Sequence, residues 1–221
     1  MNRPPVKIGG FGSDYDPGLL AAVAVLGALY WKGATGRGQF IDLSKQEALI
    51  SMQRIESVTY ANGGESMNRQ GQRSGRMPGG IMPCKDGHVV VVTPEEHQWK
   101  AFMELLGNPE WSKGDLCKDS QARAENTDKL NELIIEWMLE HNKEEIFKKG
   151  QALSCPIAPV NSAKDVVESE QMEARNFFVE MEHPAAGRIK KFPSSPYRFS
   201  KTPWRLNRPA PLLGQHNREI F

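Results

Sequence analysis

The chain has 221 residues, of which 39% are hydrophobic, so it can bury a core and form one large domain or two small ones. Its 28 basic and 27 acidic residues nearly cancel, which argues against a nucleic-acid partner or an anionic membrane surface. The three cysteines, Cys84, Cys117 and Cys155, are far apart and lie outside any CxxC pattern. We therefore expect neither disulfides nor a metal site, and we expect a reducing cytoplasm as the location.

The first predicted element is a helix from Gly18 to Trp31. Its sequence, GLLAAVAVLGALYW, is apolar nearly all round, which predicts a helix that packs on several sides. It is shorter than the roughly 20 residues that a membrane helix needs, so we interpret it as a buried helix and expect no membrane. Asp14 and Asp16 precede it and are expected to cap its start. The N-terminal sequence lacks the apolar centre of a signal peptide, so secretion is not indicated.

A glycine-rich connection follows this helix. The sequence GATGRGQ comes after a helix and lacks the spacing of a dinucleotide-binding loop, so phosphate binding is the less favoured interpretation. Phe40, Ile41 and Leu43 predict a short strand. Ser44, with Glu47 three residues later, predicts a capping box at the start of another helix.

The sequence PGGIMPCKDGHVVVVT, residues 78–93, predicts a β hairpin. The valine run is β-branched, and Asp86 followed by Gly87 is a favoured hairpin turn. Pro78, Gly79 and Gly80 stand just before the first strand. Two glycines there indicate either a turn that needs positive φ or a place where another molecule approaches the main chain. Both interpretations stay open at this point.

Two amphipathic helices, an edge strand and an irregular tail are predicted next. One helix is expected at residues 95–107, with a buried face formed by Trp99, Phe102, Met103 and Leu106. Another is expected at residues 127–142, capped by Thr127, with a buried face formed by Leu130, Leu133, Ile134, Trp137 and Met138. SCPIAPV predicts an edge strand, because two prolines cannot donate to a central ladder. From about Ala185 the chain is rich in proline, which predicts a loop that packs on another surface.

The pattern of the sequence assigns no catalytic residue. Asp14, Asp16, Asp42 and Asp86 are the candidates for covalent or acid–base chemistry. Helix capping accounts for the first two, and the hairpin turn accounts for Asp86. The five histidines are scattered without the spacing of metal ligands.

Six stretches of the sequence, taken in order, cover nearly the whole chain. They are DYDPGLLAAVAVLGALYWKGATGRGQFIDLSKQEAL, PGGIMPCKDGHVVVV, WKAFMELLGNPEW, CPIAPVNSAKDV, ARNFFVEMEHPAAGRIK and PAPLLGQHNREIF. In their order and spacing they resemble the class III CoA-transferase (CaiB/BaiF-like) family, which also contains acyl-CoA racemases.

The resemblance implies an α/β fold: a small α+β domain, an incomplete part of a Rossmann-like large domain, and an interlocked dimer. It implies that residues 1–72 belong to the large domain and a linker, residues 73–184 to the small domain, and residues 185–221 to a segment that returns to the large domain. The chain would correspond to the carboxyl-terminal half of a family member. The nucleophilic aspartate of the family is expected upstream of this chain.

By resemblance, the expected function is that of a subunit or fragment of an acyl-CoA:carboxylate CoA-transferase, inactive alone. Its partners would be an acyl-CoA, a carboxylic acid, and either a second copy of itself or a polypeptide carrying the amino-terminal half. CoA would be a carrier on the substrate, and no cofactor is expected. Pro78, Gly79 and Gly80 match the place of a glycine-rich loop that covers the active site in this family. The alternatives are a non-catalytic oligomerising module and a racemase-type fragment.

Overall fold

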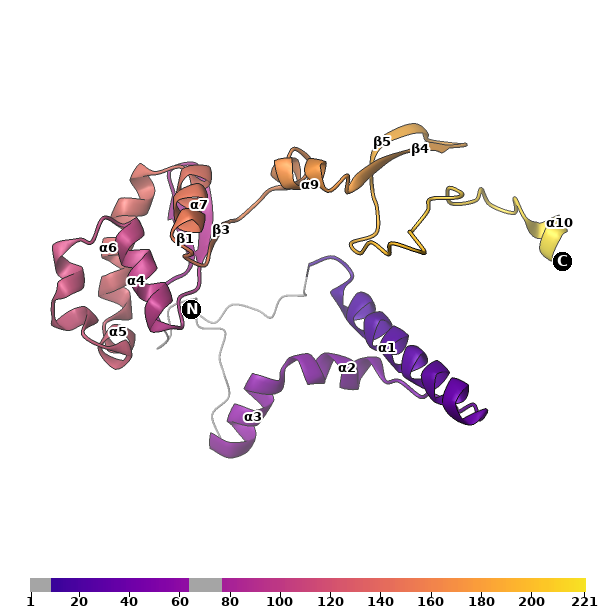
Figure 1. Cartoon of the computed structure of the whole chain (residues 1–221), viewed down its shortest axis with the longest axis horizontal. Coiled ribbons are helices and arrows are strands. Elements are labelled where there is room, and N and C mark those ends of the chain that lie inside the picture. The colour runs from indigo at the N-terminus through magenta and orange to yellow at the C-terminus, as the bar shows by residue number, and fades with distance from the viewer. Residues whose placement is uncertain (1–8, 64–76) are drawn as a thin grey trace. The chain divides into compact units, whose positions relative to one another are not determined.

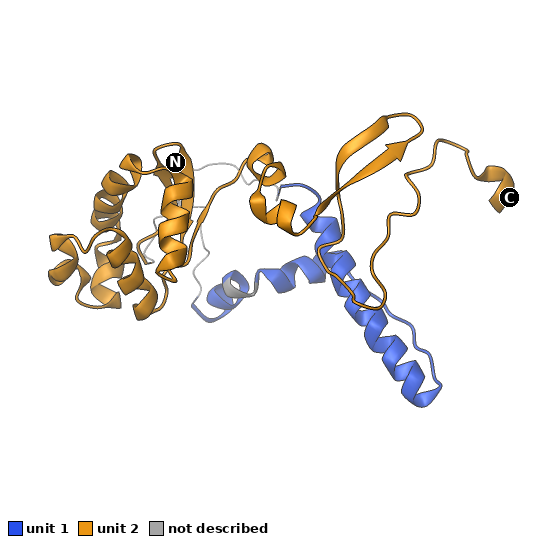
Figure 2. Ribbon diagram, turned by 45° about the horizontal axis from the view of Figure 1, so that its top comes forward, with its two compact units in different colours: residues 1–74 blue, residues 75–221 orange. Residues whose placement is uncertain are grey.

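The computed structural model describes residues 9–63 and 77–221 and divides into two compact units. Unit 1 comprises residues 1–74 and unit 2 comprises residues 75–221 (Figure 2). The predicted domain division at 72/73 lies outside the described residues, and it stays a prediction.

Unit 1 contains three helices in its described part: α1 (Gly12–Thr35), α2 (Lys45–Met52) and α3 (Arg54–Gly63). α1 is longer than the predicted helix, and its N-cap is Phe11. Asp14 and Asp16 therefore lie inside the helix, so the expectation that they cap it is wrong. Gly36 ends α1 in the left-handed conformation, where its φ of 72° suits a residue without Cβ.

The predicted strand at Phe40–Leu43 is also wrong. Residues 36–44 form no strand, and neither sheet of the described chain takes up this segment. A strand needs a neighbour for its N–H and C=O groups, and the apolar pattern by itself supplies none. The predicted cap after it is present, since the Ser44 side chain accepts a hydrogen bond from the Glu47 N–H at 3.3 Å.

α1 is exposed, contrary to the expectation of a helix packed on several sides. Leu19 and Leu26 are each 66% exposed, and Pro17 is its buried residue. By length and composition α1 is also long and apolar enough to cross a membrane. Burial needs a facing surface, and α2 covers only part of α1 in the described chain.

The first part of unit 2 is built on a three-stranded antiparallel sheet in the order β1-β2-β3. Its strands are β1 (Gly80–Cys84), β2 (Gly87–Val91) and β3 (Ile157–Pro159). Figure 1 labels the outer strands, β1 and β3. Gly80 pairs with Val91 and Cys84 pairs with Gly87, which makes a two-residue turn. The predicted hairpin and the predicted edge strand are both confirmed, but Lys85 and Asp86 form the turn and Gly87 is the first residue of β2.

Helices pack around this sheet. They are α4 (Glu96–Leu105), the short 3-10 helices η1 (Glu110–Lys113) and η2 (Asp115–Cys117), α5 (Ser120–Glu125), α6 (Thr127–Glu140) and α7 (Lys143–Ala152). α6 packs against β1, and α7 packs against β2 and β3. The predictions of α4 and α6 are confirmed, but the cap of α6 is Asn126. The Thr127 hydroxyl instead donates back to the last turn of α5, with the carbonyls of Arg123 and Ala124 at 3.0 and 2.9 Å.

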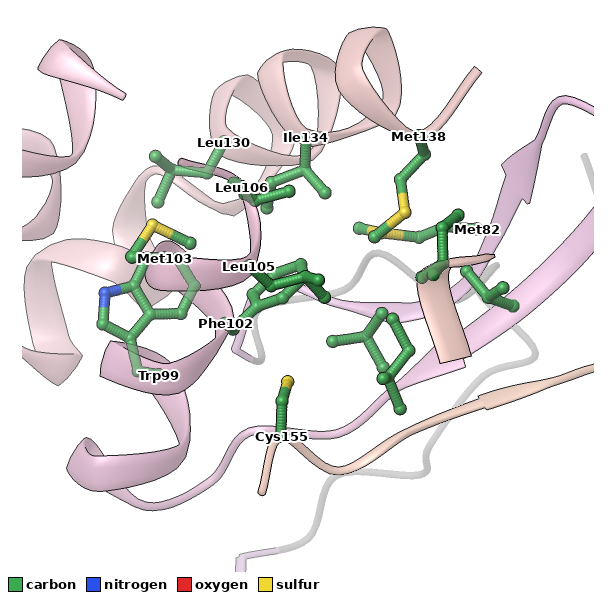
Figure 3. Close-up of a cluster of buried hydrophobic side chains, with 14 of the residues drawn as sticks. Met82, Trp99, Phe102, Met103, Leu105, Leu106, Leu130, Ile134, Met138 and Cys155 are labelled. Carbon is green, nitrogen blue, oxygen red and sulfur yellow. The ribbon is translucent and has the colours of Figure 1, made fainter. Parts of the chain in front are cut away.

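The core lies between the sheet and these helices (Figure 3). Phe102 of α4 and Leu130, Ile134 and Met138 of α6 are each 0% exposed. Their i, i+4, i+8 spacing on α6 places the three side chains on one face. Complete burial of each such side chain contributes about 1.5–3 kcal/mol, so this region has its own core.

The remainder of unit 2 contains α8 (Ala163–Val167), α9 (Glu170–Ala174), β4 (Phe178–His183), β5 (Gly187–Pro193) and α10 (Asn217–Ile220). β4 and β5 pair with each other as a separate antiparallel hairpin. The irregular tail predicted from about Ala185 is therefore wrong for residues 187–193. The predicted domain division at 184/185 falls in the turn of this hairpin and stays a prediction.

Candidate functional site

The predicted substrate-binding residues lie at the start of β1. Pro78 and Gly79 are buried, and Gly80 is the half-buried first residue of the strand. Gly79 has a φ of 128° and Gly80 a φ of 86°. L-residues rarely adopt this region, so the backbone here requires glycine. The positive φ that one of the two interpretations required is present at both glycines.

Gly79 is fixed from two sides. A Cβ added to it would lie 2.8 Å from the carbonyl oxygen of Val91, which belongs to β2. On the other side, its N–H donates to the Oδ1 of Asn131 in α6 at 3.0 Å, in a buried position. The close approach that glycine permits at this position is thus an approach to the chain's own second strand.

Thr93 supplies a second buried polar group near the start of β1. It is 2% exposed, and its Oγ1 has no hydrogen-bond partner among the described residues. Thr93 lies two residues after Val91, which pairs with Gly80 at the start of β1, and Pro78 lies two residues before Gly80. Both Pro78 and Thr93 are buried. A buried hydroxyl without a partner is unfavourable, and neither charge nor periodicity in the sequence could have signalled it.

The four candidate aspartates do not meet in one site. Asp14 pairs with Lys45 at 2.5 Å, on the exposed surface of unit 1. Asp16 is half-buried and Asp42 is exposed. Asp86, in the hairpin turn, accepts a hydrogen bond from the Lys143 N–H at 2.7 Å, so it caps the start of α7. Of the described residues, no group of three or more His, Cys, Asp or Glu is placed to hold a metal ion.

Cys155 is a weak candidate nucleophile. It is buried, and burial raises the pKa of its thiol to about 11. The thiolate is the nucleophilic form of cysteine, and a thiol with this pKa is almost fully protonated at neutral pH. Burial also raises the pKa of Cys84 and of Cys117. The three cysteines therefore serve as apolar packing groups.

Two ionic contacts join helices in the first part of unit 2. The Arg123 guanidinium is buried, donates to Glu96 at 2.6 Å and lies 5.0 Å from the Trp99 ring, so it ties α5 to α4. Lys143 of α7 donates to Asp165 of α8 at 2.7 Å. That hydrogen bond, with others from Ser162, holds the pKa of Asp165 well below its usual range, and it raises the pKa of Lys143.

A groove with a volume of about 690 Å³ lies between the β4–β5 hairpin and the segment that follows it. Its walls include Tyr197, Phe199 and Trp204, which are 56%, 56% and 40% exposed, and two arginines, Arg198 and Arg208. Exposed aromatic and arginine side chains are typical of surfaces that contact another protein. The sequence did not predict this groove, because it arises from the unpredicted hairpin.

Comparisons with known sequences point to one family. The family model for CoA-transferase family III matches residues 1–217. Formyl-CoA:oxalate CoA-transferase of Streptomyces avermitilis is 30% identical over 235 residues, which cover 99% of this chain and 57% of that protein. Human succinyl-CoA:glutarate CoA-transferase is 29% identical over 221 residues, covering 100% of this chain and 50% of that protein. The chain spans about half the length of the curated relatives that it matches.

Solved structures show the same fold. A CaiB/BaiF family protein from Brucella suis aligns with a TM-score of 0.74 at 25% identity, over 99% of this chain and 57% of that one. A protein from Mycobacterium tuberculosis aligns with a TM-score of 0.79 at 19% identity, over 97% of this chain and 57% of that one. The mixed α/β fold of the chain thus matches somewhat more than half of these structures.

Proposed function

The chain belongs to CoA-transferase family III, and we propose on this basis that it is the carboxyl-terminal part of an acyl-CoA:carboxylate CoA-transferase. The observation that carries the proposal is the family match over residues 1–217. The relatives named above are CoA-transferases for different acids, oxalate in one case and glutarate in the other. Their common feature is transfer of CoA between two carboxylic acids.

In the proposed reaction an aspartate carboxylate attacks the acyl-CoA thioester. The C–S bond breaks, a mixed anhydride forms, and CoA leaves as a thiolate. The thiolate then attacks the aspartyl carbonyl of the anhydride, which gives an aspartyl-CoA thioester and frees the first acid. The second acid repeats these steps in reverse and leaves as the new acyl-CoA. This is covalent catalysis by a carboxylate.

We assign the nucleophile to a polypeptide segment other than this chain. Asp14 and Asp86 are engaged by Lys45 and by the start of α7, Asp42 is exposed, and Asp16 lies half-buried within α1. An anhydride formed on a solvent-exposed carboxylate would be hydrolysed by water, so an exposed aspartate is a poor nucleophile for this reaction. The amino-terminal part of a family member is the proposed source of the aspartate.

Pro78, Gly79 and Gly80 are the proposed substrate contact. Gly79 is held between β2 and α6, which gives the segment a fixed base. Gly80 is half-buried and presents main chain without a side chain, which suits close approach of an acyl group. The acyl-CoA would therefore meet backbone groups at the start of β1.

We propose further that another polypeptide chain covers the apolar surface of α1 in a cytoplasmic assembly. The Brucella suis structure aligns over 99% of this chain, so α1 corresponds to a helix of the CaiB/BaiF fold. Large apolar side chains such as Leu19 and Leu26 are exposed along α1, and an extended exposed apolar surface marks a contact surface. The partner would be the amino-terminal polypeptide, a second copy of the chain, or both in an interlocked dimer.

The test is turnover by the purified chain, alone and co-expressed with the amino-terminal part of a formyl-CoA:oxalate CoA-transferase, on a panel of acyl-CoA donors and acids. We expect exchange only in the combined sample. Turnover by the chain alone that is lost in Asp14→Asn or Asp16→Asn would contradict the assignment of the nucleophile. A stable complex without turnover would favour the non-catalytic module, and loss of α-proton stereochemistry without exchange would favour a racemase.

A further inference from the structure

We infer that Asn131 is a positioning residue that holds the start of β1 in place for the acyl-CoA. This inference rests on the proposed function of Pro78, Gly79 and Gly80. The observation behind it is the buried hydrogen bond from the Gly79 N–H to the Asn131 Oδ1, at 3.0 Å between residues 52 positions apart in the sequence.

The Gly79 N–H lies outside the sheet ladder. The last paired residues of β1 and β2 are Gly80 and Val91, so no β2 carbonyl in the ladder register pairs with Gly79. A buried N–H needs an acceptor, and here a side chain takes the place of a strand. The Asn131 carboxamide thus continues the support of the sheet by one residue.

Asn131 is itself held rigidly. It is 3% exposed, and its neighbours on α6, Leu130 and Ile134, are 0% exposed. These side chains anchor the helix in the core, as Figure 3 shows for Leu130 and Ile134. The backbone of α6 that carries the carboxamide is therefore fixed in the core.

A role in helix stability does not explain an asparagine at this position. Asparagine is a poor helix former, and a buried polar side chain is unfavourable unless it is hydrogen-bonded. Leucine branches at Cγ as asparagine does and would suit the apolar neighbours Leu130 and Ile134. The acceptor for Gly79 is the contact that justifies the polar group, and it determines where the backbone of Gly80 lies.

The test compares Asn131→Leu, which removes the acceptor, with Asn131→Asp, which keeps an oxygen in the same place. Ile134→Val, on the same helix and equally buried, is the control for a loss of core packing. The first readout is hydrogen exchange at the Gly79 amide, with Val89 and Val91 in β2 as internal references. Asn131→Ala keeps the test decisive if leucine prevents folding.

We expect Asn131→Leu to speed exchange at Gly79 about tenfold or more relative to Val89 and Val91, and Asn131→Asp to restore protection. Equal acceleration at all three amides, or the same acceleration in Ile134→Val, would overturn the inference. So would unchanged protection of Gly79 in Asn131→Leu.

The second readout is the KM for acyl-CoA in the enzyme reconstituted with the amino-terminal part. We expect KM to rise several-fold in Asn131→Leu, to return in Asn131→Asp and to stay unchanged in Ile134→Val. A loosened Gly79 with unchanged KM and kcat would overturn the positioning role and leave the proposed function intact. Absence of turnover in the unmodified reconstituted enzyme would overturn the proposed function and, with it, the substrate role of Asn131.

Discussion

Two apolar helices of this chain have opposite surroundings. α6 buries Leu130 and Ile134 completely against the sheet and α4, whereas α1 leaves Leu19 and Leu26 66% exposed. Their sequences do not account for the difference, because α1 is the more continuously apolar of the two. The difference lies in the partners available: α6 finds its facing surfaces inside the described chain, and α1 does not. An apolar surface predicts that something covers it and does not tell what that is.

Truncating one leucine in each helix tests this difference, and we expect here the largest change in the free energy of unfolding. Leu130→Ala should lower the free energy of unfolding by about 2–5 kcal/mol, because it leaves a cavity in a closed core. Leu26→Ala, at an exposed position, should change it by about 0.5 kcal/mol or less. Urea unfolding of the two variants, at a dilution at which the chain is monomeric, measures both values. Equal losses would mean that α1 is buried in the isolated chain.

The next effect concerns the fixed backbone at the start of β1. Gly79→Ala should lower stability by about 1–3 kcal/mol through the strained φ, with an added penalty from the contact with the Val91 carbonyl. Gly107→Ala is the control, because its φ is also positive but a Cβ there meets no atom within 4 Å. Thermal melting of both variants gives the difference. A smaller loss in Gly79→Ala than in Gly107→Ala would show that β2 yields at this point.

A pH titration probes the contact between α7 and α8. The lowered pKa of Asp165 means that its contact with Lys143 stabilises the fold above the carboxyl's unfolded pKa and is lost as the pH falls through its folded value. The raised pKa of Lys143 means that the same contact is also lost at alkaline pH, as the pH rises through the folded pKa of the lysine. Asp165→Asn should therefore melt at a lower temperature than the unmodified chain at pH 7. This difference in melting temperature should become smaller in acid.

Melting temperature measured from pH 7 to pH 2 follows this difference. Glu168→Gln is the control, because the contact of Glu168 with Lys164 is long, 3.9 Å, and lies on an exposed surface. An equal difference at every pH, or the same narrowing in the control, would contradict the proposed origin of the stabilisation.

The smallest effect is expected at Thr93. Thr93→Val removes a buried hydroxyl without a partner, so it should leave stability unchanged or raise it by about 1 kcal/mol. Thr127→Val removes a buried hydroxyl that has partners, and it should lower stability by about 1–3 kcal/mol. Chemical denaturation compares the two. A clear loss in Thr93→Val would show that its hydroxyl binds a group essential to the fold.

Local signals predicted the elements of the middle region well. These signals act over a few residues: the valine run, the Asp86-Gly87 pair, and the four-residue spacing of Leu130, Ile134 and Met138. The structure confirms the strand and the helix. The two glycines likewise predicted a special backbone, but only the structure shows that their close neighbour is β2.

The errors arose where structure depends on distant partners. Phe40 and Leu43 read as a strand, yet a strand forms only beside another strand. The β4–β5 hairpin was missed because the prolines of the tail outweighed the alternation at residues 178–193. Asn131 gave no signal at all, since its bond to Gly79 spans 52 positions.

We have proposed that the exposed face of α1 is a contact surface of a larger transferase assembly. Sedimentation velocity of the purified chain at micromolar concentration tests this proposal. We expect a species larger than the 24.7 kDa monomer, which shifts toward the monomer when Leu19 and Leu26 are changed to serine. A stable, monodisperse 24.7 kDa monomer that gains no mass when the amino-terminal part of a family member is added would contradict the claim.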